Sequence, residues 1–266
     1  DALPISIMDT ELGVLGTITE ENMSEIEAIV DGKRELPSDL DMASKMVLEE
    51  IISMGSDMLL TNDKIPTVTT KDFSQFWNGV KERTQSSAAG LHYGVYKAAA
   101  KDEVNANVHA KQLTLIARSG VYPLRWAKSM QILMQTRAGE EVDMTNLRYL
   151  QLFEGDFNQM KQIFIGRIAM ENLVISGLLP EEHGSRRGST AVDSSFDVVL
   201  SVDTSRQSRT TMAILSMDVA QCYDRVNHIT VAMVWIILIR NTMVVFLILS
   251  CLQTMEFFQR TGHGDS

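Results

Sequence analysis

The sequence contains little cysteine, and the placing of its cysteines excludes two kinds of structure. Of the 266 residues only Cys222 and Cys251 are cysteine, and they lie far apart with no histidine cluster nearby. A disulfide framework is therefore excluded, and nothing indicates a zinc site. A reduced, intracellular setting is expected, either cytoplasmic or nuclear.

A secretory leader is also missing, because no basic segment followed by an apolar one opens the chain. We therefore expect a protein that is not secreted. The first residue is Asp1 and not methionine, which favours a fragment. No internal repeat or long low-complexity segment is present. With 45% hydrophobic and 22% charged residues, the composition is that of a folded chain long enough to bury a sizeable core.

The net charge of −10 argues at first against a nucleic-acid partner, since phosphate binding needs a basic surface. The acidic residues are concentrated, however. Residues 1–63 hold 15 acidic and 3 basic side chains, net −12, whereas residues 64–266 hold 19 acidic and 21 basic ones, net +2. Most of the N-terminal charges are expected to solvate helix faces.

Apolar spacing predicts helices over most of the chain. One is expected from Thr19 or Glu20 to Gly32, and another begins near the candidate N-cap Ser38 with an apolar stripe at Met42, Met46, Val47 and Ile51. A third follows Thr69 or Thr70, and a fourth runs through Tyr96 to Ala100. Later helices are expected at 155–174, from Gly155, and at 191–206.

Three segments read as strands. One is the apolar segment between the Pro-Leu-x-Trp element and a polar turn around Gly139, and another is 147–153. The strongest candidate is the apolar run at 210–219, which contains Asp218. The stretch "LSMDVAQCYDRVNH" then places Asp218 and Asp224 six residues apart. An aspartate at a strand end can present a carboxylate to a metal ion, but it is also a common turn former or helix N-cap.

Four blocks in this order resemble a non-LTR retrotransposon reverse transcriptase. They are "FWNGVKERTQSSAAGLHYGVYKA", "LRYLQLFEGDFNQMKQIFIGRI", "EEHGSRRGSTAVD" and "LSMDVAQCYDRVNH", the last similar to polymerase motif A. The resemblance implies a helix-rich α+β chain: a partial right-hand polymerase fold, with fingers and an incomplete palm, behind an N-terminal helical extension. It also implies RNA-directed DNA polymerase (nucleotidyltransferase) activity with an RNA template, a DNA primer and a dNTP.

The resemblance assigns roles within motif A. Nucleotidyl transfer uses two divalent ions that activate the primer hydroxyl and stabilise the leaving pyrophosphate. Asp218 is the implied catalytic ligand of Mg²⁺ (or Mn²⁺), which prefers hard oxygen ligands. Tyr223 lies where the family places an aromatic residue under the incoming sugar. Asp224 and Asn227 are implied to support the turn into the next helix and not to hold metal.

Arginines are the implied contacts to phosphate. Arg148 matches a fingers arginine that reaches the triphosphate, a role that suits a guanidinium because its fork holds two oxygens. Thr136 stands where relatives carry a lysine, and the adjacent Arg137 is the candidate substitute. A surface ion pair is the alternative for Arg148. Two further arginines in a glycine-bounded loop are implied to contact the template or primer backbone: Arg186 and Arg187.

In the first block His92 and Lys97 fit a nucleic-acid-facing surface, although relatives carry other residues at Ala88, Ala89 and Leu91. A structural role is the alternative for His92.

The apolar stretch at 229–255 has the length of a membrane span. Arg240 and Asn241 lie in its middle, where an arginine costs roughly 3 kcal/mol. Two packed helices with a break at these residues are therefore expected, and no stable membrane association.

The 266 residues contain no Tyr-x-Asp-Asp turn, the family's motif C, and no motif B. The resemblance therefore implies an incomplete enzyme that is inactive alone. Four parts are expected: an acidic helical extension at 1–63, a helical region at 64–118, fingers and early palm at 119–210, and the motif A strand with its following helices at 211–266. A non-catalytic helical interaction protein and a membrane-anchored protein are the alternatives.

Overall fold

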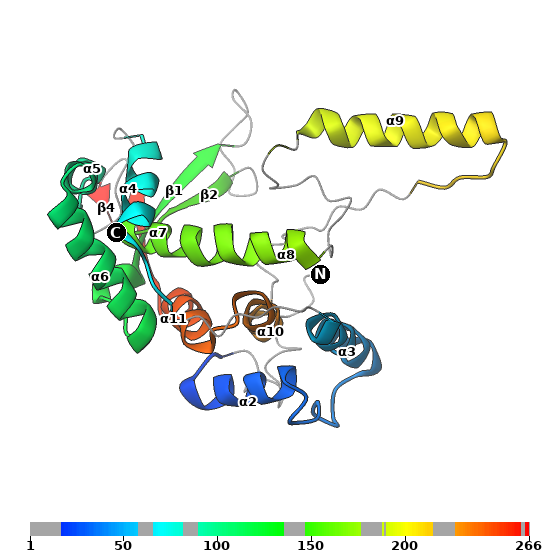
Figure 1. Ribbon diagram of the computed structural model, residues 1–266, viewed down its shortest axis with the longest axis horizontal. Helices are drawn as coiled ribbons and strands as arrows, with labels where there is room; N and C mark the ends of the chain where they lie inside the picture. The colour runs from blue at the N-terminus through cyan, green and yellow to red at the C-terminus, as the bar shows by residue number, and fades with distance from the viewer. Residues whose placement is uncertain are drawn as a thin grey trace. The chain divides into compact units, whose positions relative to one another are not determined.

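The computed structural model describes residues 17–57, 66–81, 90–135, 147–176, 188, 190–214, 227–261 and 264–265. By their contacts the residues form two compact units (Figure 1). Unit 1 contains residues 1–172 and 227–266, and unit 2 contains residues 173–226. The four-part division expected from the sequence stays a prediction.

The N-terminal segment of unit 1 forms two helices. Helix α2 (Glu20–Val30) begins at Thr19, which forms a capping box with Asn22, so the predicted start is confirmed. Helix α3 (Met42–Asp57) begins after Asp41, whose carboxylate accepts the amides of Ala43 and Ser44, each at 3.0 Å. The prediction of Ser38 as its cap is wrong, because Asp41 is adjacent to the first turn and reaches both amides.

Three helices surround an aromatic core. They are α4 (Thr70–Gly79), α5 (Tyr93–Ala100) and α6 (Glu103–Ser119). Thr69 caps α4, and its side chain accepts the amide of Asp72 at 3.1 Å. The fully buried Trp77 stacks on Tyr96 with ring centroids 4.3 Å apart. Phe73 and Trp77, the two buried residues of α4, therefore form the centre of this core.

A small sheet follows the short 3₁₀ turn η2 (Leu124–Ala127). The predicted strands β1 (Lys128–Gln135) and β2 (Leu147–Leu152) pair antiparallel. Two strands were not predicted: β3 (Glu256–Thr261), which pairs parallel to β1, and β4 (Gly264–Asp265). Among the described residues the strand order is β2-β1-β3-β4, which leaves β2 at one edge.

The chain then runs through three consecutive helical segments. They are α7 (Gly155–Ile163), the π-helical η4 (Phe164–Ala169) and α8 (Met170–Ser176). The helix predicted from Gly155 is confirmed, but its π-helical middle was not expected. Gly155 permits close packing at its start, since a Cβ there would lie 2.6 Å from the Trp77 ring.

Unit 2 contains helix α9 (Ala191–Ser208), which Thr190 caps and which confirms the helix predicted there. Residues 210–214 form no strand, so the strand predicted over 210–219 is wrong for its first half. A short apolar run becomes a strand only beside a partner, and none of the described strands pairs with it. Residues 215–219 lie outside the described residues.

The apolar C-terminal stretch forms two helices, as predicted. Helix α10 (His228–Ile239) ends at Arg240, which adopts a left-handed conformation with φ 54°, and α11 (Thr242–Gln253) begins after the cap Asn241. Within the described part of the chain, no helix combines the length and apolar character needed to cross a bilayer. Helix α2 packs on both helices and covers them with Met23, Ile26 and Ile29.

Candidate functional site

The edge strand β2 carries the predicted nucleotide-binding residue Arg148. It lies opposite Met134 in the antiparallel register of β1 and β2. Strand β2 leads through two residues into α7, so the order is hairpin and then helix, as the resemblance implies. Its companion Arg137 lies outside the described residues.

The two predicted nucleic-acid contacts of α5 have structural roles in the protein. His92 caps the helix, because its Nδ1 accepts the amide of Gly94 at 3.0 Å. Lys97 donates from Nζ to the carbonyl of Val80 at 2.6 Å and so ties α5 to the end of α4. His92 is exposed, whereas Lys97 is half-buried.

The motif A region is described only at its end. Asn227 is the N-cap of α10, and its side-chain oxygen accepts the amides of Ile229 at 2.8 Å and Thr230 at 3.2 Å. The other predicted site residues lie outside the described part of the chain: Asp218, Tyr223, Asp224, Arg186 and Arg187.

A buried polar centre lies at the start of α7, next to the sheet. Asp156 accepts a hydrogen bond from Trp126 Nε1 at 2.7 Å on one oxygen and forms an ion pair with Arg125 through the other. The amide of Phe157 adds a third bond at 3.1 Å. Glu154 is fully buried two residues earlier. This centre fixes η2, which precedes β1, onto the helix that follows β2.

Burial and charge shift the titration of the groups around this centre. The pKa of Tyr96 is raised, first because its hydroxyl is buried and second because Asp156 is near. The pKa of His109 is lowered, chiefly by burial against Phe73, on which its ring stacks at 5.0 Å. Burial is the largest influence on Arg125 and lowers its pKa, but the charge and hydrogen bond of Asp156, together with Tyr96 and Glu154, outweigh burial, and the net shift is upward. The arginine therefore stays charged.

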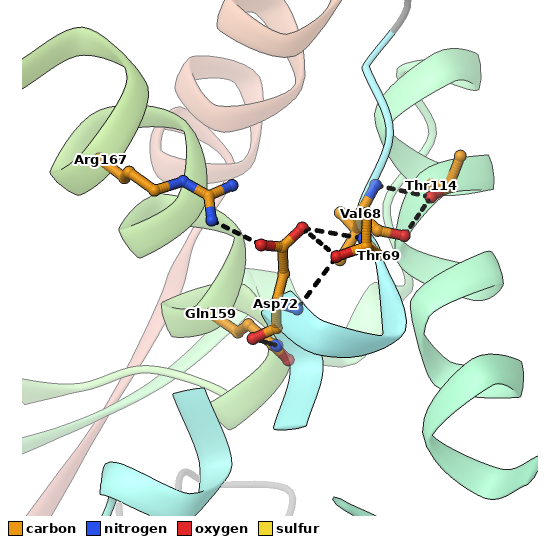
Figure 2. Close-up of polar contacts among 6 residues, drawn as sticks. All are labelled: Val68, Thr69, Asp72, Thr114, Gln159 and Arg167. Carbon is orange, nitrogen blue, oxygen red and sulfur yellow. Dashed lines mark hydrogen bonds and ion pairs between the residues drawn. The ribbon is translucent and has the colours of Figure 1, made fainter. Parts of the chain in front are cut away.

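A second polar group joins α4 to the π-helical η4, as Figure 2 shows. Arg167 donates to one oxygen of Asp72 at 2.5 Å, and the other oxygen accepts the amide and hydroxyl of Thr69 at 2.9 and 2.8 Å. Burial raises the pKa of Asp72, but these bonds outweigh it and hold the pKa below its usual value. Thr114 of α6 holds the preceding Val68 through both backbone groups, at 2.9 and 3.2 Å.

Two side chains that carry nucleophilic groups interact electrostatically: the half-buried Lys161 of α7 and the fully buried Cys251 of α11. Lys161 Nζ lies 3.6 Å from the centroid of the Phe153 ring and 5.1 Å from that of Phe157. Burial lowers the pKa of Lys161 to about 8 and raises that of the fully buried Cys251 to about 12. A thiol with so high a pKa is a poor nucleophile at neutral pH.

Neither polar group was singled out from the sequence as a site. Asp72 was recognised only as the residue that follows a cap, and Asp156 only as part of a helical block. Asp72 and Arg167 lie 95 residues apart in the sequence. Asp156 and Arg125 lie 31 residues apart. The periodic spacing of residues in the sequence does not indicate contacts between residues so far apart.

The geometry defines a helix-rich α+β protein whose polar groups anchor a strand hairpin between helices. The chain matches no known protein-family model, and none of the curated proteins matches it. Among the described residues, no group of three or more His, Cys, Asp and Glu side chains is placed to hold a metal ion. Asp218, the predicted ligand, is not among those residues.

Proposed function

We propose that the chain is part of an RNA-directed DNA polymerase, a reverse transcriptase of a non-LTR retroelement, intracellular and incomplete by itself. The proposal rests on four sequence blocks in the family's order, from "FWNGVKERTQ" through "LSMDVAQCYD". Its partners would be an RNA template, a DNA primer and a dNTP.

The structural observation that supports the proposal most is the β1–β2 hairpin with Arg148 on its edge strand. In a polymerase, such a hairpin belongs to the fingers. A guanidinium on an edge strand can approach a triphosphate and hold two of its oxygens. The ion pair of Asp156 with Arg125 supports this role, because it holds the start of the hairpin onto α7, the helix that follows β2 directly.

Asp218 would hold Mg²⁺ together with carboxylates from outside these 266 residues. The bound ions would supply charge stabilisation at the phosphorus and a more acidic primer hydroxyl. The chain itself would bind the nucleotide through Arg148, place Tyr223 under the sugar and begin the following helix at Asn227. Because motifs B and C are not in the sequence, extension by this chain alone would be negligible.

Nucleotide binding by the 266-residue chain tests the role of Arg148. We expect a fluorescent dNTP with Mg²⁺ to bind, and Arg148→Ala to weaken binding by about tenfold or more, since a lost charge-assisted contact costs about 1.5–3 kcal/mol. Arg118→Ala is the matched control, because Arg118 is an exposed arginine that bonds to the backbone of Pro66. Equal affinity of Arg148→Ala and wild type would rule out the role of Arg148.

A helical interaction protein is the second candidate, and helix α3 favours it. Met42, Met46 and Val47 are 75%, 59% and 56% exposed, so three of the four residues of the predicted apolar stripe face outward. Such a stripe on one helix is typical of a protein contact. A chain that binds neither template–primer nor dNTP at low salt would favour this candidate over the polymerase.

A further inference from the structure

A π-helical turn interrupts the helix that follows the sheet. Residues Phe164–Ala169 form it, between α7 and α8. π-helices are rare, and those that occur are mostly single turns inside α-helices, often at functional sites. Polar contacts are made by one residue before this turn and by one within it, so the turn affects the relative direction of the two side chains.

Both sets of contacts begin on the same face of the helix. Gln159, before the turn, accepts from Trp77 Nε1 at 2.8 Å and donates to the carbonyl of Asp72 at 3.5 Å. Arg167, within the turn, donates to the Asp72 carboxylate at 2.5 Å. Figure 2 shows the two side chains pointing from one helix toward Asp72. Gln159 and Arg167 therefore both face α4, although they are eight residues apart.

A regular α-helix would not align the two side chains this closely. Eight residues of α-helix rotate by about 800°, which would leave Arg167 about 80° from the direction of Gln159. One α-turn of about 3.6 residues and one π-turn of about 4.4 residues together contain about eight residues, so the two side chains align. The π turn thus allows Arg167 to reach Asp72 while Gln159 keeps its contacts.

The next contact depends on the same alignment. Asn172, in α8, is buried and donates from Nδ2 to the carbonyl of Leu238 in α10 at 2.6 Å. If the turn became α-helical while Gln159 stayed in place, the following residues would rotate by about 80°. Arg167 and Asn172 would then both leave their partners.

We propose that the Phe164–Ala169 turn is a two-state register switch. In the π state the Asp72–Arg167 pair and the Asn172–Leu238 bond both form. In the α state both contacts are broken, the backbone regains regular α-helical bonds, and α8 is rotated. The polar contacts oppose the backbone preference, so a change at Arg167 shifts the equilibrium. The inference goes beyond polymerase function and does not depend on it.

Hydrogen exchange on the full chain tests the switch. Arg167→Leu removes the contact that holds the π state, so we expect the amides of residues 164–169 to exchange about tenfold more slowly than in the wild type, because α-helical bonds replace π-helical ones. A static ion pair predicts the opposite, since its loss would leave exchange unchanged or faster. Either of those results would overturn the proposal.

A deletion supplies the matched control. Without Ile165, seven residues of α-helix separate Gln159 from Arg167, and their rotation of about 700° keeps the two aligned within about 20°. In the Ile165 deletion variant, the amides of this segment should therefore exchange more slowly than in the wild type. Adding Arg167→Leu to the deletion should not slow their exchange further.

A second measurement needs no deletion. Asn172→Ala should destabilise the wild type but not Arg167→Leu, in which the Asn172 bond is already broken. Equal destabilisation in both backgrounds would show that Arg167 and Asn172 are uncoupled and would contradict the switch.

Discussion

At the scale of single residues, Asp72 joins a helix cap to an interhelical ion pair. One carboxylate oxygen completes the capping box with Thr69, and the other receives Arg167 from a helix 95 residues later. The side chain of Asp72 is 12% exposed and that of Arg167 is 39% exposed. The pair is therefore partly shielded from solvent, and its loss should be measurable.

We expect Asp72→Asn to destabilise unit 1 by about 1–3 kcal/mol at neutral pH, since a partly buried charge-assisted bond is lost. The pKa of Asp72 is lowered in the folded state. Its contribution is therefore complete above the unfolded pKa of about 4 and is lost as the pH falls through the folded pKa.

Urea unfolding of the wild type and of Asp72→Asn between pH 7 and pH 2 measures this contribution. The difference between the two should shrink below about pH 4. A difference that stays constant to pH 2 would show that the carboxylate charge is not what stabilises the fold.

At the scale of elements, caps decide where the helices begin. Asn227 accepts two amides at the start of α10, and Asn241 accepts the amide of Val244 at 3.0 Å at the start of α11. Both helices are almost wholly apolar, and both begin at an asparagine. The left-handed Arg240 at the end of α10 and the cap Asn241 therefore define the break that divides the 27-residue apolar stretch, 229–255, into two helices.

We expect Asn227→Ala to lower the free energy of unfolding by about 1 kcal/mol, because two amides of the first turn lose their acceptor. Asn105→Ala is the control, since Asn105 is exposed within α6 and alanine is the better helix former there. Thermal or urea unfolding measures both. Equal stability of the two variants would contradict the role of Asn227.

Local signals explain which elements could be predicted from the sequence. Thr19 and Thr69 each lie three residues before the side chain that completes the capping box, so the sequence indicates where both helices begin. Strand β3 was missed because its partner β1 lies more than 120 residues earlier and its apolar residues are only Phe257 and Phe258. A separation of 95 residues likewise hid the pairing of Asp72 with Arg167.

The π turn was missed for a different reason. Phe164 and Ile168 fit the apolar spacing of an ordinary α-helix, and the extra residue per turn becomes visible only through the contacts of Gln159 and Arg167. Of the candidate site, the sequence indicated the hairpin and the cap at Asn227. The structural roles of His92 and Lys97 depend on backbone groups that no side-chain pattern reveals.

At the scale of the whole molecule, the acidic N-terminal segment is part of unit 1. Helix α2 packs on α10 and α11, and the side chain of Gln253 accepts the amide of Ile18 at 2.8 Å across 235 residues. Helix α2 and the C-terminal helices therefore share one core. This arrangement predicts that they unfold together.

We expect Ile26→Ala to destabilise unit 1 by about 2–4 kcal/mol, because the side chain is 2% exposed in that shared core. Intrinsic fluorescence and far-UV circular dichroism should report the same shifted transition, since Trp77 and Trp126 belong to the same unit. A separate early transition of the N-terminal helices would contradict this.

We propose that the chain is part of a reverse transcriptase in which Asp218 holds the catalytic metal. Primer extension on an RNA template tests it most directly, with a chain that continues through motifs B and C. We expect Asp218→Ala to abolish extension, whereas Asp203→Ala, an exposed aspartate of α9, keeps it. Undiminished extension by Asp218→Ala would contradict the account.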